Sequence, residues 1–504
     1  MPEPGAQGQA PTPAVGDLLE LEVGPVAHGG HCVARHEGQV VFVRHALPGE
    51  RVRARVTGTG PQGRFLHADA LEVLTASPDR VEPPCPFAGP GRCGGCDWQH
   101  ATVESQRRLK GEVVAEQLRR LGGLTEEEVA QLAGGDGRTL VADAVPGDAD
   151  GPAALVAEAV PGDADGRTLV AEAVAGDVDG LRWRTRVEFA VDREGRPGLR
   201  RHRSHEVVAV DDCLIATDGV VGTGVLGVPA PPGVAALDVV APSVGEPVVV
   251  PLELVEDSRR GPGSGGASPS GARSRSGPAS PSGARSRRGA RHTLRPAGPV
   301  PEVTERVSGQ MFTLSARGFW QVHPGAASTF SEQVLAWLDP RPGERALDLY
   351  SGVGLFAVPL AEAVGPSGSV LAVEAEAEAT AAAQRHLAAY PWAEAVAEPT
   401  ERALRRLVDA GERADVVVLD PPRTGAGAEV LRAVAALGPR AVVYVACDPA
   451  ALGRDVRTAR ELGLELVSLR VLDAFPMTQH VECLALLRPA GEAEAARARP
   501  TRGA

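Results

Sequence analysis

Reactive side chains stand at the ends of strand-like segments in the C-terminal third of this 504-residue chain. Cys447 follows the apolar run AVVYVA, and Asp420 follows VVVL and precedes two prolines that stiffen the chain. Glu482 stands at the start of the last such segment, ECLALLRP. Because the carboxyl ends of parallel strands meet at one edge of a sheet, we expect these side chains to share a cleft. A thiol and carboxylates in one cleft indicate nucleophilic catalysis assisted by a base.

Two interpretations stay open for Cys447 and for Glu482. The sequence after Cys447 predicts a helix, and a thiol near a helix N-terminus has a lowered pKa that favours the nucleophilic thiolate. A lone Cys after a Val-rich strand is more often a core residue. Glu482, two positions after His480, is either a general base or a solvated strand residue.

A loop of small residues, 351–354, separates the strand-like segment RALDLY from a helical stretch. Gly352 and Gly354 let the backbone approach a ligand closely. Glu374 ends the next strand-like segment, about twenty residues on, where an acid can accept hydrogen bonds from ribose hydroxyls. Asp348 and the missing third glycine of G-x-G-x-x-G favour S-adenosyl-L-methionine over a dinucleotide. A Gly-rich turn without a ligand is the alternative.

Three of the seven cysteines, Cys85, Cys93 and Cys96, lie close together in PPCPFAGPGRCGGCDWQH. The N-terminal residues lack the features of a secretory signal and no apolar run is long enough to span a membrane, so we expect a cytoplasmic protein with reduced thiols. The cysteines are therefore interpreted as ligands, nucleophiles or core residues and not as disulfides, and spacing alone would not separate a zinc site from an iron–sulfur site. The C-x3-C-x2-C triad of radical S-adenosylmethionine enzymes is absent.

Short β-rich runs between residues 16 and 73 predict a five-stranded barrel. Such barrels often bind oligonucleotides, and the arginines interleaved with Phe42 and Phe65 are either an RNA-binding lining or a solvated basic face. The net charge of −13 argues weakly against a nonspecific polyanion binder. The residues of that lining are Arg35, His36, Arg44, Arg53, Arg55 and Arg64.

Two insertions interrupt the chain. A tandem repeat begins at Gly137, Gly151 and Gly166, with too few copies for a solenoid, and only its last copy is expected to lead into the fold. The segment 257–296 is rich in Ser, Gly, Pro and Arg, so it buries too little apolar area to order and is expected to be disordered.

From residue 303 onward, strand-like and helical stretches alternate, which predicts a Rossmann-like α/β domain closed by a β-hairpin.

With these motifs assembled, residues 303–488 resemble the catalytic domain of the RNA uracil-C5 (5-methyluridine) methyltransferases. The similarity lies in FWQVHPGA, DLYSGVGLF, AVEA, LDPPR, YVACDPAALGRD and FPMTQHVE, and the N-terminal barrel resembles the TRAM domain. The resemblance implies that Cys447 is the nucleophile and Glu482 the base. It also implies contacts with S-adenosyl-L-methionine at Gln321, Tyr350, Glu374 and Asp420.

The same resemblance supplies a fourth cysteine, Cys213, for a 4Fe-4S cluster with Cys85, Cys93 and Cys96; four-thiolate zinc is the alternative. The chain departs from the family pattern at three places. Asp448 stands where Asn is common, FPMTQHVE replaces the frequent FPHTGHVE, and Leu355 stands where Asn is often found.

We therefore expect an α/β enzyme that methylates carbon 5 of a uridine in RNA, with ribosomal RNA favoured over transfer RNA, and with neither a membrane nor an obligate protein partner. The alternatives are an amino-group methyltransferase that uses the Asp-Pro-Pro loop and a non-catalytic RNA-binding protein. The expected organisation is a disordered tail (1–15), an OB-like TRAM barrel (16–76), a middle RNA-binding domain with the Fe-S cysteines (77–302, with insertions at 136–165 and 257–296), a Rossmann-like methyltransferase domain (303–490) and a second disordered tail (491–504).

Overall fold

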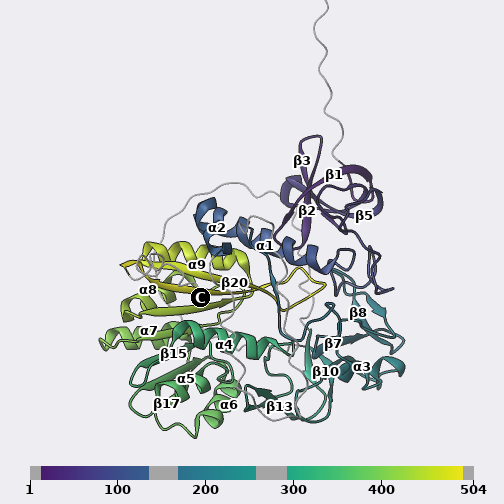
Figure 1. The fold of residues 1–504 in the computed structure, drawn as a ribbon. Coiled ribbons are helices and arrows are strands. Elements are labelled where there is room, and N and C mark those ends of the chain that lie inside the picture. Colours follow the sequence, from purple (N-terminus) through teal and green to yellow (C-terminus); the bar gives the residue numbers. More distant parts are fainter. Residues whose placement is uncertain (1–12, 135–167, 257–291, 492–504) are drawn as a thin grey trace, which may run out of the picture.

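The computed structural model describes residues 13–134, 168–256 and 292–491 (Figure 1). The predicted repeat insertion at 136–165 lies outside the described residues, as do residues 257–291 of the second insertion. Within the described part of the chain, no helix is long and apolar enough to cross a membrane.

The N-terminal part is a closed five-stranded barrel in the order β1-β2-β3-β5-β4, which confirms the predicted barrel. Alternate residues of β1, among them Leu19, Leu21 and Val23, point into its core, as the period of two requires. Strand β3 pairs with β5 in parallel and the other neighbours pair antiparallel. The strands are β1 (Leu18–Ala27), β2 (His31–His36), β3 (Gln39–Arg44), β4 (Arg51–Thr59) and β5 (Phe65–Thr75).

Helix α1 (Val103–Arg120) follows the cysteine-rich loop and begins at Thr102, whose hydroxyl accepts a hydrogen bond from the Ser105 backbone N–H. With α2 (Glu126–Gly134) it packs on the C-terminal sheet and shares a core with α9. Gly111 permits the close approach of the chain at Leu169, because a Cβ at Gly111 would lie 1.8 Å from the Leu169 carbonyl oxygen.

The last copy of the tandem repeat does lead into the fold. Its strand β6 (Glu172–Ala173) pairs in parallel with β20 at the edge of the C-terminal sheet, and Leu169 and Ala171 are buried. Together with α1 and α2, this strand belongs to the predicted middle domain (77–302) but packs on the methyltransferase sheet. The predicted boundary therefore does not separate two independent cores.

The middle part is a six-stranded antiparallel sheet in the order β12-β11-β10-β7-β8-β9. The end of the predicted disordered insertion (257–296) is wrong, because residues 292–296 form β12 and pair with β11. The alternation in this short run lets Leu294 pack against the core. The strands are β7 (Arg186–Val191), β8 (Pro197–Arg200), β9 (Val207–Ala209), β10 (Val234–Val240), β11 (Val248–Glu256) and β12 (His292–Pro296), with the short helix α3 (Asp218–Val221) after β9.

The C-terminal part is an eight-stranded sheet in the order β17-β16-β15-β18-β19-β21-β20-β6. Only β21 runs antiparallel to its neighbours, β19 and β20, which confirms the predicted closing hairpin. The strands are β15 (Arg345–Leu349), β16 (Ser369–Glu374), β17 (Ala393–Ala397), β18 (Val416–Leu419), β19 (Ala441–Ala446), β20 (Leu464–Asp473) and β21 (Glu482–Pro489).

Helices cover both faces of this sheet, as in a Rossmann-like fold (Figure 1). One face packs against α4 (Ala326–Leu338), α5 (Ala357–Val364) and α6 (Ala377–Leu387). The other packs against α7 (Thr400–Asp409), α8 (Gly427–Leu437) and α9 (Pro449–Glu461), together with α1 and α2. The hairpin of β13 (Glu302–Val307) and β14 (Gln310–Ser315) precedes α4.

Candidate active site

A cavity of about 1060 Å³ opens at the carboxyl edge of the eight-stranded sheet. It brings together all but one of the predicted cofactor and catalytic residues. Those that line it are Gln321, Tyr350, Gly352, Glu374, Asp420, Cys447 and Glu482. The ends of these strands therefore meet in one cavity of the structure, as expected from the sequence.

Sheet register explains how the nucleophile candidate meets the base candidate. Ala446 pairs with Cys483 across the antiparallel strands β19 and β21. One step further along the same register, Cys447 stands opposite Glu482, and directly opposed residues present their side chains on the same face. The hairpin that reverses the chain after β20 is therefore what turns a carboxylate towards the thiol.

The loop after β15 is shaped by residues in the left-handed region. Tyr350 has φ +62°, Gly352 +53° and Gly354 +91°. The backbone N–H of Gly352 donates to a carboxylate oxygen of Glu374 (3.0 Å), and so ties the loop to the end of β16. Gly354 does not line the cavity. Its N–H donates to the Ser351 carbonyl (2.8 Å), so Gly354 closes the turn.

Acidic side chains lie in the cavity wall and directly behind it. Asp348 is fully buried in β15, and burial, followed by the charges of Asp420 and Glu374, raises its pKa to about 8. Among the described residues its oxygens have no hydrogen-bond partner at bonding distance, although the backbone N–H of Ala357 acts against the rise in pKa. Burial also raises the pKa of Asp420 to about 7. A cationic ligand would relieve this crowding of acids, and S-adenosyl-L-methionine carries a sulfonium.

The predicted lowering of the Cys447 pKa is wrong for the free protein. Burial and then the nearby Glu482 and Asp420 raise the pKa of the thiol to about 12. The helix N-terminus offers little compensation, because the Asp448 side chain already accepts the Ala451 N–H (2.7 Å) and the first helical residue is a proline, which has no N–H.

Glu482 is buried, and its pKa is raised well above the usual value, first by burial and then by Asp420. The Arg423 guanidinium lowers the pKa of both Glu482 and Cys447. Arg423 lines the cavity directly after the Asp-Pro-Pro sequence. The free cavity thus favours the neutral forms of the Cys447 thiol and the Glu482 carboxyl, although the Arg423 guanidinium acts against this.

Sequence reasoning missed several lining residues, although two of them stood inside the motifs. Arg423 ends LDPPR, and Phe319 opens FWQVHPGA; the Phe319 side chain is 72% exposed within the cavity lining. Trp183 also lines the cavity and stacks on the buried His323, with ring centroids 6.1 Å apart. Nothing in the pattern around Trp183 distinguishes it from a core aromatic residue.

The four predicted metal ligands come from two segments that the fold places near each other. The charges of the other three cysteines contribute to raising the pKa of Cys96, and those of Cys213 and Cys85 help raise that of Cys93 to about 11. Burial is the larger cause for both and also raises the pKa of Cys213. Among the described residues, however, no group of three or more His, Cys, Asp or Glu side chains is arranged to hold a metal ion.

Comparison with known proteins agrees with this geometry. Residues 319–490 match the family described as tRNA (uracil-5-)-methyltransferase, and residues 14–71 match the TRAM domain. An RNA methyltransferase of Streptomyces coelicolor is 46% identical over 483 residues, which cover 96% of this chain and 95% of that protein. The 23S rRNA (uracil(1939)-C(5))-methyltransferase RlmD of Pseudomonas putida is 30% identical, with 96% of each chain covered. The chain belongs to the RNA uracil-C5 methyltransferases.

The solved structure of Pyrococcus abyssi tRNA (uracil-54, C5)-methyltransferase in complex with S-adenosyl-L-homocysteine has the same fold as this methyltransferase. The TM-score is 0.57 at 18% identity, with 93% of this chain and 100% of that chain covered. The enzyme depends on S-adenosyl-L-methionine.

The TRAM barrel of the methyltransferase carries a cluster of rings on its surface. Phe42 and Phe65 meet edge to face, with centroids 5.3 Å apart, and His67 packs against both. Much of the predicted basic lining is already paired: Arg53 bonds to Glu20 and Glu72, and Arg44 is mostly buried beside Asp97.

The barrel also reaches the catalytic strand ends. His28, in the turn between β1 and β2, lies 3.1 Å from the Asp448 carboxylate, next to Cys447. Asp448, a departure from the family pattern, thus links the barrel to α9 by accepting from both His28 and Ala451.

Proposed function

We propose that this methyltransferase transfers a methyl group from S-adenosyl-L-methionine to carbon 5 of a uridine in 23S ribosomal RNA through a covalent adduct with Cys447. The observation that carries the proposal is the opposition of Cys447 and Glu482 within a single cavity that also contains Glu374 and Asp420.

The order of the strands gives the cavity two ends. Glu374, at the end of β16, accepts the backbone N–H groups of Gly352 and Glu376 and retains lone pairs for the ribose hydroxyls. Strands β15 and β18 separate it from β19, which Cys447 follows. A cofactor with its ribose at Glu374 would extend past Gln321, Tyr350 and Asp420 towards the thiol.

The chemistry explains the need for a thiol. Carbon 5 of uracil is a weak nucleophile, so the Cys447 thiolate adds to carbon 6 and the electrons of the carbon 5–carbon 6 double bond move onto the carbonyl at carbon 4. Carbon 5 of this enolate then forms a bond to the methyl carbon while the methyl–sulfonium bond breaks, leaving neutral S-adenosyl-L-homocysteine. The product of this step is a methylated thioether adduct.

Release of the product needs a base. Glu482 takes the carbon 5 proton, the carbon 5–carbon 6 double bond returns, and Cys447 leaves as a thiolate. A raised pKa suits this task, because a carboxylate with a higher pKa is a stronger base. The target uracil must leave any base stack to reach the cavity. The exposed Phe319 ring and the ring cluster of the barrel supply surfaces on which RNA bases can stack.

The choice of ribosomal RNA rests on relatives. The Pseudomonas putida and Chromohalobacter salexigens proteins, each 30% identical, are named for uridine 1939 of 23S rRNA. Transfer RNA is the second candidate, because the matching family description names it. Either substrate places the reaction in the cytoplasm.

We also propose that Cys85, Cys93, Cys96 and Cys213 hold a 4Fe-4S cluster, with zinc as the alternative. The donor set is of the right kind, and burial raises the pKa values of Cys93 and Cys213, so these thiols become thiolates only where a cation compensates. Because methyl transfer needs no electron, such a cluster would have a structural role in holding the cysteine loop or a role in RNA binding.

A covalent trapping experiment tests the reaction. Cys447→Ala should abolish methyl transfer, whereas Glu482→Gln should accumulate a protein–RNA adduct that survives denaturing electrophoresis. Full methylation by Cys447→Ala would favour an amino-group methyltransferase, and RNA binding without any methyl transfer would favour a non-catalytic protein. Mapping 5-methyluridine in ribosomal and transfer RNA from cells with and without the gene identifies the substrate.

A further inference from the structure

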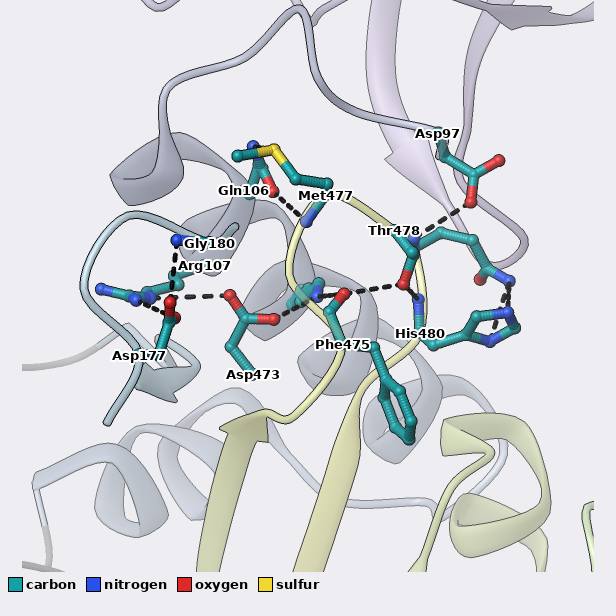
Figure 2. A network of polar contacts seen from close by, with 12 residues as sticks. Asp97, Gln106, Arg107, Asp177, Gly180, Asp473, Phe475, Met477, Thr478 and His480 are labelled. Carbon is teal, nitrogen blue, oxygen red and sulfur yellow. Dashed lines mark hydrogen bonds and ion pairs between the residues drawn. The ribbon is translucent and has the colours of Figure 1, made fainter. Parts of the chain in front are cut away.

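The segment 473–481, called the 473–481 loop below, runs from the last residue of β20 to the residue before β21 and leads into the proposed base, since Glu482 pairs with Leu472 across the hairpin. Its inner side lines the cavity through Phe475, Thr478 and His480. On its outer side the loop bonds to α1 and to the cysteine-rich loop, as Figure 2 shows.

One end of this loop is anchored by a buried charge. Lys110 of α1 is 1% exposed and donates to the Asp473 carboxylate, which is fully buried. The second acid, Asp177, pairs with Arg107 at 2.8 Å, and Arg107 also lies 3.6 Å from Asp473. Two cations therefore balance two acids beneath the loop (Figure 2).

A series of hydrogen bonds connects Lys110 with the backbone next to the proposed base. The Lys110 ammonium also donates to the Phe475 carbonyl (3.0 Å), which accepts the Thr478 hydroxyl (2.7 Å). The Thr478 oxygen accepts the backbone N–H of His480 (3.2 Å), two residues before Glu482. The Lys110 ammonium is thus connected, directly at Phe475 and through Thr478 at His480, to the backbone near both ends of the loop.

The middle of the loop holds a strained residue. Met477 has φ +64°, a conformation that is unfavourable for a residue with a side chain and persists where surrounding contacts fix it. Its N–H donates to the Gln106 side chain (2.8 Å), and its carbonyl accepts the N–H groups of Asp97 (2.9 Å) and Trp98 (3.0 Å). Gln106 and Lys110 are four residues apart, so both lie on the face of α1 that meets the loop.

We propose that Gln106 and Lys110 of α1 are positioning residues for the base: they hold the 473–481 loop so that Glu482 reaches carbon 5 of the bound uracil. Neither residue lines the cavity. The inference rests on the proposed covalent route, in which the addition of Cys447 and the methyl transfer precede the step that requires Glu482. Loosening the loop should therefore slow resolution of the adduct more than its formation.

The test uses Lys110→Met and Gln106→Leu in the full chain, with Arg108→Met as the matched control. Arg108 lies on the same helix but pairs with Asp79, away from the loop. RNA and labelled S-adenosyl-L-methionine are mixed in a single turnover, and methyl transfer and denaturation-resistant adduct are followed together. We expect resolution of the adduct to slow by about 10- to 100-fold in both loop variants, the size of effect that a small misplacement produces, with the control unchanged.

Glu482→Gln is run in parallel to separate the two hypotheses. If Glu482→Gln forms no adduct while it still binds cofactor, the covalent route itself fails. If it forms the adduct but Lys110→Met and Gln106→Leu resolve theirs at the rate of the unmodified enzyme, the positioning role is overturned. Loss of methyl transfer without adduct in folded, cofactor-binding loop variants overturns it equally. Gln106→Leu leaves no unpaired charge, so it provides the answer should Lys110→Met not fold.

Discussion

Replacing Asp348 by Asn should stabilise the cofactor-free methyltransferase, and more so as the pH rises. Asp348 lies within β15, with 0% of its surface exposed, and burial together with the charges of Asp420 and Glu374 raises its pKa to about 8. Asp348 does not line the cavity. Asn has nearly the same shape and carries no charge, so the substitution removes the titration and leaves the packing.

The direction in which stability changes with pH follows from whether the folded or the unfolded state binds more protons. An unfolded chain releases the Asp348 proton near pH 4, whereas the folded protein keeps it up to about pH 8. Between these values the folded state holds more protons, so its stability falls as the pH rises, by at most about 1.4 kcal/mol per pH unit. Above the folded pKa the loss levels off. Over the whole window this carboxyl costs the folded state on the order of 5 kcal/mol as an upper bound.

The assay compares thermal unfolding midpoints of Asp348→Asn and the unmodified protein, both without cofactor, from about pH 5 to about pH 8. We expect the midpoint of the variant to exceed that of the unmodified protein by a margin that grows with pH. Asp339→Asn is the control, because that side chain is 71% exposed and the residue already has the left-handed conformation that Asn tolerates. A margin that stays constant across this range would refute the argument that Asp348 is buried in its protonated form.

Three further outcomes concern the site, the cysteine ligands and the core of the C-terminal domain. In the free protein, the rate of Cys447 alkylation, measured by mass spectrometry, should be low at neutral pH and rise towards about pH 12. A cationic cofactor analogue should shift this pH profile to lower pH by about one to three units, relative to the profile with neutral S-adenosyl-L-homocysteine. Cys213→Ser should lower the bound iron or zinc of anaerobically purified protein without changing cofactor affinity; unchanged metal content would remove Cys213 from the ligand set. Tyr444→Phe should lower stability by about 1–2 kcal/mol in denaturant unfolding, because the Tyr444 hydroxyl donates to the buried Asp455 carboxylate (2.7 Å).

The positions of Asp420, Cys447 and Glu482 were predictable because they stand at the ends of strand-like segments, whereas Gln321 and Tyr350 were predicted only from the family resemblance. Apolar runs followed by Asp420 and Cys447 place those residues at one sheet edge, and the short connection before Glu482 requires a hairpin. Short β-rich runs likewise predicted the barrel. The strand β12 was missed because only five residues at the end of a low-complexity segment form it, and its order comes from pairing with β11.

The ionisation of the site was not predictable in the same way, since a pKa depends on burial and on neighbours distant in sequence. The expectation for Cys447 considered the helix N-terminus and omitted Glu482, thirty-five positions later in the chain but opposite in the sheet. One local signal was available. Asp448 followed by Pro449 is the pattern of a capped helix that begins with proline, and such a helix has fewer free N–H groups to offer a thiolate.

Burial is the largest cause of the raised pKa values of Cys447, Asp420 and Glu482, and neighbouring acids add to it for Cys447 and Glu482, while Arg423 lowers the pKa of both. Each group is therefore most easily ionised when positive charge enters with the ligand. In the proposed reaction a sulfonium supplies such a charge, and its loss on methyl transfer raises the proton affinity of Glu482 at the step assigned to this residue as the base. In that scheme the cofactor favours the thiolate before transfer and the protonated carboxyl after it, which links the direction of the reaction to the charge of the cavity.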